Sequence, residues 1–169
     1  MKALLLVGGF GTRLRPVIPS LPKTLAPLGD RPFLELLLRQ LSGQGINHLI
    51  LCTGYLADQI EDVFQNGSGF GATIEYSKEV VPLGTAGALK LAREHVERES
   101  EFLVLNGDSF LETDFDKLIA FHRKHRALAT MAVVSEAEAD PPLPPEAVTW
   151  LTCGDEAPAA TFTVTAIDG

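Results

Sequence analysis

Between residue 2 and about residue 134, short apolar runs alternate with segments whose apolar residues recur every three or four positions. A short continuous apolar run is typical of a strand buried on both faces, and strict alternation is typical of a half-buried strand. These patterns predict strands at residues 2–7, 48–53, 72–77, 101–106 and 127–134. Helical spacing predicts helices at residues 31–41, 57–64, 85–96 and 114–125.

Strands that alternate with helices at these lengths indicate an α/β fold, with a Rossmann-like, mainly parallel sheet and helices on both faces. In such sheets, ligands bind outside the carboxyl ends of the strands, near the point where the strand order reverses. The loops in which we expect chemistry are therefore residues 8–16, 53–56, 78–86 and 106–110.

The composition changes after Val134. The net charge of the chain is −8, yet residues 127–169 hold seven acidic and no basic residues, together with five of the 11 prolines. We predict an α/β domain at residues 1–134 and an acidic, alanine- and proline-rich tail at residues 135–169. The abrupt loss of basic residues favours a frame change or a truncation after about Val134. We therefore expect the C-terminal part of the fold to be incomplete, which leaves self-association into a homo-oligomer open.

Composition also argues against several classes of partner. Clustered basic residues, the mark of a nucleic-acid site, are lacking, and the longest apolar stretch, "ALLLV", is far shorter than the roughly 20 residues of a membrane span. Cys52 and Cys153 are too few and too far apart to indicate a disulfide framework or a zinc site. We expect no nucleic-acid or membrane partner, and a reducing, cytoplasmic compartment.

The stretch "GGFGTRLRP" at residues 8–16 is the strongest candidate for chemistry. Glycines let backbone N–H groups approach phosphate oxygens, but the spacing fits neither the dinucleotide fingerprint nor the Walker loop. Arg13 adds a planar fork of donors, and Lys23, in a loop stiffened by prolines, adds a point charge. Taken singly, these cations are most simply solvated loop charges; together with the glycines they indicate a site for a triphosphate.

Four segments together resemble a known family. "LVGGFGTRLRP", "LPKTLAPL", "PLGTAGAL" and "LVLNGDSF" follow the order of the motifs of sugar-phosphate nucleotidyltransferases, also called nucleotide-sugar pyrophosphorylases. The resemblance covers residues 1 to about 134. Within the family, "RPFLELLL", "TGY" and "PLGTAGALKLA" are most similar to the guanylyltransferase branches that act on heptose 1-phosphate and mannose 1-phosphate.

The resemblance implies nucleotidyl transfer from a nucleoside triphosphate, with GTP favoured, to a sugar 1-phosphate, giving a nucleotide-sugar and pyrophosphate. The attacking phosphate is already an anion, so catalysis consists of positioning and charge neutralisation. Arg13 would stabilise the departing pyrophosphate, Lys23 would bridge toward the α-phosphate, and Asp108 would hold Mg²⁺. The backbone amides of Gly8, Gly9, Gly11 and Thr12 would receive the triphosphate, while Gly84 and Thr85 would line the pocket for the base and ribose.

Other residues leave two interpretations open. Thr85 is also a candidate helix N-cap, and residues 53–55 form either part of the nucleotide site or a plain turn. Glu79 either contacts the base or is a solvated charge at a strand end. The four histidines, which follow no metal spacing, are expected on surfaces, and Cys52 is expected in the core.

Two further functions remain as alternatives. The sugar-binding residues and the second metal-binding aspartate that the family carries in its later part have no counterpart that the sequence identifies here. A nucleotide-binding module without turnover, or a regulatory subunit of the same fold, would also fit such a chain. The sequence does not decide which sugar 1-phosphate or which base is used.

Overall fold

The computed structural model describes residues 1–12, 14 and 16–132. The chain forms two compact units, residues 1–112 and 113–169. Arg13, Arg15 and the acidic tail at residues 135–169 lie outside the described residues.

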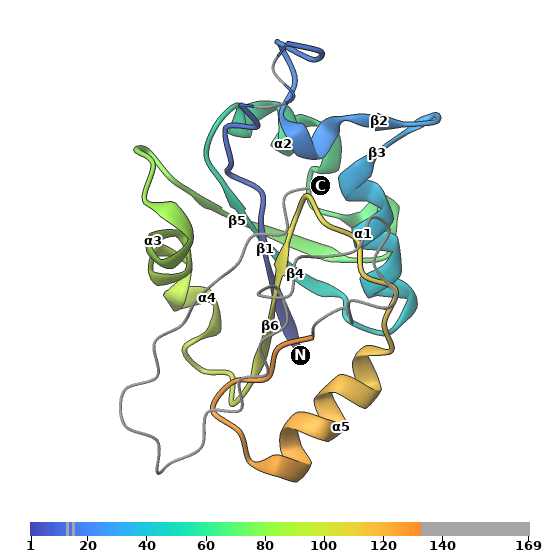
Figure 1. Cartoon of the computed structure of the whole chain (residues 1–169), viewed down its shortest axis with the longest axis vertical. Helices are drawn as coiled ribbons and strands as arrows, with labels where there is room; N and C mark the ends of the chain where they lie inside the picture. Colours follow the sequence, from blue (N-terminus) through green and yellow to red (C-terminus); the bar gives the residue numbers. More distant parts are fainter. Residues whose placement is uncertain (13, 15, 133–169) are drawn as a thin grey trace, which may run out of the picture. The chain divides into compact units, whose positions relative to one another are not determined.

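Four parallel strands form the sheet of the first unit, in the order β5-β4-β1-β6 (Figure 1). Each coincides with a strand expected from the sequence to within one residue at either end. Buried apolar side chains explain the two central strands, because β1 and β4 expose almost none of their aliphatic residues. The strands are β1 (Lys2–Leu6), β4 (His48–Thr53), β5 (Thr73–Lys78) and β6 (Phe102–Asn106).

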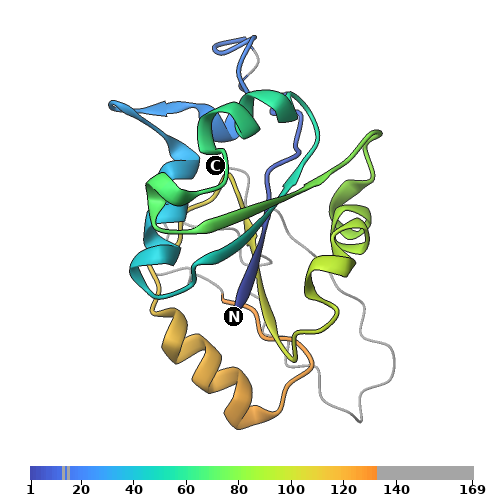
Figure 2. The same cartoon turned by 180° about the vertical axis from the view of Figure 1, so that it is seen from behind.

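Helices cover both faces of this sheet, as the sequence predicts. Figures 1 and 2 show α1 (Phe33–Gly43) on one side of the sheet and α3 (Gly84–Leu91) with α4 (Arg93–Val96) on the other. The helix α2 (Ala57–Phe64) connects β4 to β5. Against the face covered by α3 and α4 lies a cluster of buried residues: Leu4, Ile50, Cys52, Ala88, Ala92 and Val96. Burial raises the pKa of the Cys52 thiol to about 11, which suits the expected core role.

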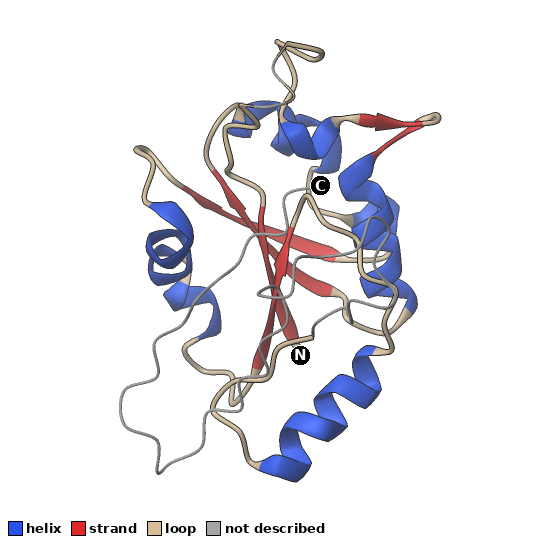
Figure 3. Ribbon diagram, in the orientation of Figure 1, coloured by secondary structure: helices blue, strands red, loops and turns tan. Residues whose placement is uncertain are grey.

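Two local features differ from the expectation. Residues 31–32 do not begin the helix; they form β3 (Arg31–Pro32), which pairs in antiparallel fashion with β2 (Pro27–Leu28) around Gly29 at φ +65° (Figure 3). The helix expected at 85–96 is divided at Ala92, where ψ is 1° rather than near −42°. Two short 3₁₀ turns complete the unit, η1 (Lys23–Leu25) and η2 (Ser68–Phe70).

The second unit contains α5 (Phe115–His125), whose last turn holds His122, Arg123, Lys124 and His125, where positive charge complements the helix dipole. The strand expected at 127–134 is wrong over its described part, since residues 127–132 contain only a single bridge, at position 129. Alanine is a weak strand former, and three of these six residues are alanine. Within the described part of the chain, no helix is long and apolar enough to cross a membrane.

Glu75 on β5 links three elements of the first unit through its carboxylate. Its Oε1 contacts His48 Nε2 at the start of β4, and its Oε2 lies 2.8 Å from His95 Nδ1 on α4. The side chain of His95 is only 17% exposed, so the expectation that it lies on the surface is wrong. Hydrogen bonds from His95, then from His48, hold the pKa of Glu75 below its ordinary value of 4.5.

We predict that Glu75→Gln lowers the free energy of unfolding by about 1 kcal/mol at pH 7, because a charged acceptor for two imidazoles is replaced by a neutral amide. A carboxyl whose pKa is depressed by folding stabilises the protein above the pKa of the unfolded chain and loses that contribution as pH falls. The difference in the free energy of unfolding between wild type and Glu75→Gln is therefore expected to shrink below pH 4.5. Urea unfolding from pH 3 to 7 measures it, with the exposed Glu97→Gln as control; a difference independent of pH would contradict the assignment.

Candidate active site

The candidate site lies at the carboxyl ends of the parallel strands, at the point where the strand order reverses. β1 is central: the chain proceeds from β1 to β4 and β5 on one side and later returns to β6 on the other. The loops that follow β1, β4 and β6 consequently leave the sheet next to one another. These are three of the four loops in which the sequence places the chemistry.

The ends of β1 and β4 approach closely through two glycines. A Cβ on Gly8 would lie 3.1 Å from Gly54 N, and a Cβ on Gly54 would lie 3.1 Å from Gly8 O. Gly8 O also accepts the backbone N–H of Tyr55 at 3.3 Å, and the rings of Tyr55 and Phe10 are 5.5 Å apart. The glycine loop is thus packed against the turn after β4, so residues 54–55 support the loop at its base.

Lys23 is held beside the same loop. Gly11 has φ +57°, and a Cβ there would lie 2.9 Å from Lys23 Cβ, so glycine is required at this crossing. Lys23 begins η1 after Pro22, and the next two residues, Thr24 and Leu25, are buried. These contacts fix the backbone of Lys23 and leave its side chain directed out of the core.

Asp108 and Lys23 meet at this edge. Lys23 Nζ lies 3.1 Å from Asp108 Oδ2, with the two side chains 38% and 39% exposed. Asp108 is placed by Gly107, whose N–H donates to Leu6 O at 2.9 Å at the end of β1. Ion pairs with this exposure add at most about 1 kcal/mol to stability, so the pair is not explained by a structural role.

Asp108 has the chemistry of a divalent-cation ligand. Its carboxylate is partly exposed, and Ser109 Oγ lies 3.4 Å from Oδ1. Mg²⁺ is commonly bound by one or two carboxylates together with substrate phosphates rather than by a cage of protein ligands. Among the described residues no group of three or more His, Cys, Asp or Glu side chains could hold a metal.

The remaining residues predicted from the sequence fall into two groups. Gly9 and Thr12 lie in the glycine loop; a Cβ on Gly9 would meet nothing within 4 Å, which leaves its backbone approachable. Gly84, at φ +69°, and Thr85 begin α3 and are exposed. The N-cap of α3 is Leu83 and no side chain caps it, so the interpretation of Thr85 as an N-cap is wrong.

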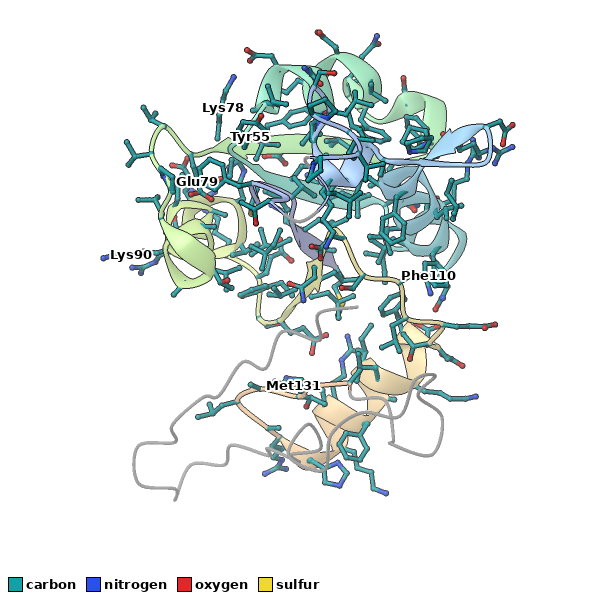
Figure 4. All side chains as sticks on the ribbon, turned by 45° about the horizontal axis from the view of Figure 1, so that its top comes forward. Tyr55, Lys78, Glu79, Lys90, Phe110 and Met131 are labelled. Carbon is teal, nitrogen blue, oxygen red and sulfur yellow. The ribbon has the colours of Figure 1, made fainter. Side chains whose placement is uncertain are left out.

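Other cations near this edge are engaged elsewhere or point away. Lys78 contacts Asp58 and lies 3.5 Å from Glu61, both on α2. The side chain of Lys90 extends from the outer side of α3 (Figure 4). Lys23 is therefore the cation that the first unit places, within its described part, beside both the glycine loop and Asp108.

Comparison with protein families identifies the chain. Residues 2–141 match the family described as nucleotidyl transferase. The chain belongs to the nucleotidyl transferase family. The resemblance in the sequence motifs is confirmed, and so is the Rossmann-like fold class.

Several members of the family are similar over most of this chain. The mannose-1-phosphate guanylyltransferase catalytic subunit beta of Xenopus tropicalis is 41% identical over 140 residues, which are 82% of this chain and 39% of that protein. The D-glycero-alpha-D-manno-heptose 1-phosphate guanylyltransferase of Campylobacter jejuni is 43% identical over 118 residues, 70% of this chain and 52% of that protein.

Among solved structures, HddC from Yersinia pseudotuberculosis, complexed with GMP-PN, superposes with a TM-score of 0.66 at 36% identity. The match covers 72% of this chain and 53% of that one. The chain thus spans between about two fifths and about half of the length of these three relatives.

Glu79 is one of the residues for which the sequence leaves two interpretations open. Glu79 follows β5, is partly buried, and accepts the backbone N–H of Leu83 through Oε2 at 2.7 Å, so it is not simply a solvated charge. A carboxylate six residues before the predicted helix at 85–96 could have suggested such a contact, but nothing in the pattern required it.

We predict that Gly107→Ala lowers the free energy of unfolding by about 1–3 kcal/mol. The added Cβ would lie 2.3 Å from Val7 Cγ1 and 2.9 Å from Leu6 O, so the end of β1 or of β6 must move. Gly9→Ala is the matched control, because its Cβ would meet nothing, and it is expected to change stability by less than about 0.5 kcal/mol. Thermal and urea unfolding of both variants test this; equal stability of the two would contradict the packing argument.

Proposed function

We propose that this chain carries the nucleotide-donor side of a sugar-1-phosphate guanylyltransferase. The protein would transfer GMP from GTP to a sugar 1-phosphate and release pyrophosphate. The observation that carries the proposal is the placement of Lys23, 3.1 Å from Asp108, against a glycine loop at the switch point of the sheet. The names of the relatives that match over most of the chain favour GTP as the donor and mannose or heptose 1-phosphate as the acceptor.

The reaction needs charge neutralisation more than proton transfer. An oxygen of the sugar 1-phosphate attacks the α-phosphorus of GTP, a new P–O bond forms, and the bond from the α-phosphorus to the bridging oxygen of the β-phosphate breaks. Pyrophosphate leaves with that electron pair, and the attacking oxygen, already anionic, needs no base. Two anions must therefore be held in line, and cations and backbone N–H groups can offset the repulsion between them.

Each predicted site residue has a place in this scheme. The amides of Gly8, Gly9, Gly11 and Thr12 would receive the triphosphate, because the loop is held open by its glycines and fixed at Gly8 and Gly11 by close packing. Lys23 would turn its ammonium group to the α-phosphate, and Arg13 is assigned to the departing pyrophosphate. Gly84 and Thr85, exposed at the start of α3, would line the pocket for the base and ribose.

Enzymes of the nucleotidyl transferase family use a divalent metal, and we assign Mg²⁺ to this chain with Asp108 as its protein ligand. When bound, Mg²⁺ would neutralise charge on the phosphates. Asp108 would hold it at the end of β6, beside Lys23, so that two positive charges face the same phosphate groups.

The proposal predicts that Lys23→Ala reduces the rate of pyrophosphate release by at least about 100-fold, because a cation that stabilises the developing charge is lost. The assay contains GTP, Mg²⁺ and either mannose 1-phosphate or D-glycero-D-manno-heptose 1-phosphate, and the faster acceptor identifies the sugar. Lys90→Ala is the matched control, since that side chain is exposed and points away from the sheet (Figure 4), and it is expected to retain full activity. Undiminished release by Lys23→Ala would refute the role of Lys23.

A second prediction concerns the metal. Asp108→Asn removes the charge of the proposed ligand, so the Mg²⁺ concentration needed for half-maximal GTP binding is expected to rise at least about tenfold. Isothermal titration with GTP at graded Mg²⁺ measures this shift, and chelation by EDTA should abolish pyrophosphate release by the wild type. GTP binding that is independent of Mg²⁺ in both proteins would contradict the assignment. Magnesium-dependent GTP binding without any pyrophosphate release would contradict turnover by this chain.

A further inference from the structure

Glu79 occupies a junction that none of the roles assigned above explains. It is the first residue after β5, and its backbone N–H donates to Thr53 O at 2.8 Å, which extends the pairing of β5 with β4 beyond the strand end. Figure 4 shows Glu79 between the end of β5 and the start of α3, on the side where Tyr55 also lies. The residue is partly buried. Its side chain is thus held at the edge of the candidate site by a backbone that cannot shift freely.

The two oxygens of its carboxylate face two different segments. Oε2 accepts the N–H of Leu83 at 2.7 Å, directly before Gly84. Oε1 lies against the start of the glycine loop, 3.3 Å from the position of a Cβ on Gly8. One carboxylate therefore accepts a hydrogen bond from the segment that leads into the pocket assigned to the base and ribose, and lies in the space beside Gly8 that a side chain there would need.

The segment between Glu79 and α3 has little else to hold it. Val80 is 96% exposed, Val81 is 60% exposed and Leu83 is 44% exposed, so apolar burial contributes little to its position. A hydrogen bond to an ionised acceptor is among the stronger single contacts that a backbone N–H can make. The position of Gly84 and Thr85 relative to the glycine loop consequently depends on the contact between Glu79 and Leu83.

We propose that Glu79 is a positioning residue that fixes the segment before α3 against the glycine loop. The two halves of the nucleotide pocket then keep one relative placement before GTP arrives. The charge of Glu79 also contributes, after burial, to the raised pKa of Cys52 near the end of β4. The hydrogen bond from Leu83 N–H to Glu79, called the tether below, does not rest on the proposed function. The expected effect of the tether on GTP binding does.

The tether can be tested without any ligand. Amide hydrogen exchange of Leu83 is compared in wild type, Glu79→Ala and Glu79→Gln. In Glu79→Ala the acceptor is gone, and exchange at Leu83 should become at least about tenfold faster; Glu79→Gln keeps a carbonyl oxygen and should recover most of the protection. Glu94→Ala, an exposed carboxylate on α4, is the matched control and should leave Leu83 unchanged. Equal exchange in wild type and Glu79→Ala would overturn the proposal.

The consequence for binding is tested with two probes, GTP with Mg²⁺ and inorganic tripolyphosphate with Mg²⁺, by isothermal titration. Tripolyphosphate requires only the glycine loop and its cations, whereas GTP requires both halves of the pocket. Glu79→Ala should weaken GTP about tenfold and tripolyphosphate less than about twofold, and Glu79→Gln should restore GTP binding to within about threefold of wild type. Equal weakening of both probes, or unchanged GTP affinity, would refute the positioning role.

One further outcome separates the inference from the proposed function. A wild-type protein that binds tripolyphosphate but not GTP would overturn the proposed function and the binding role of Glu79 with it, while the exchange measurement would still decide whether the tether exists.

If Glu79→Ala does not fold, Glu79→Asp replaces it. The shorter side chain keeps the charge but withdraws the oxygens from Leu83, so GTP should again weaken more than tripolyphosphate, and equal effects on both would refute the proposal.

Discussion

The backbone pairing of β1 on both of its edges places everything else in the candidate site. Its register sets Leu6 opposite Cys52 of β4 and opposite Asn106 of β6. Because the strands are parallel and end together, Gly8 emerges between the turn after β4 and the turn that carries Asp108. The site is thus a consequence of strand order and register, and a slip of the pairing would separate the glycine loop from its carboxylate.

At this edge of the sheet, close packing fixes the backbone, and exposed side chains carry the charges. The backbone contacts are tight at Gly8, Gly11 and Gly107, where a single Cβ would collide with a neighbour or crowd it. The charges that these contacts present, Lys23 and Asp108, remain more than a third exposed and add little to stability. A rigid backbone that presents accessible charges suits electrostatic stabilisation of a transferring phosphoryl group, since the groups need little reorganisation when the reaction occurs.

Several parts of this arrangement could be predicted from the sequence, and others could not. The four strands of the sheet follow from local patterns: β1 and β4 are buried apolar runs, β5 alternates, and β6 is an apolar run that stays partly exposed at the edge of the sheet. The division of the helix at Ala92 could not be predicted, because helical spacing extends through it. The pairing of β3 with β2 could not be predicted, because Pro32 also suits the first turn of a helix. Glu75 and its two histidines come from β5, β4 and α4, and no local pattern relates residues that far apart.

The fold class, the glycine loop and the candidate residues Lys23, Asp108, Gly84 and Thr85 can be predicted from the amino-acid sequence, because each belongs to a short motif or a local periodicity. Which of these residues meet depends on the folded chain. The ion pair of Lys23 with Asp108 joins residues 85 positions apart, and Glu79 accepts a hydrogen bond from Leu83 while its other oxygen lies in the space beside Gly8. Such contacts depend on how parallel strands bring their carboxyl ends together, and that is a property of the register rather than of any one segment.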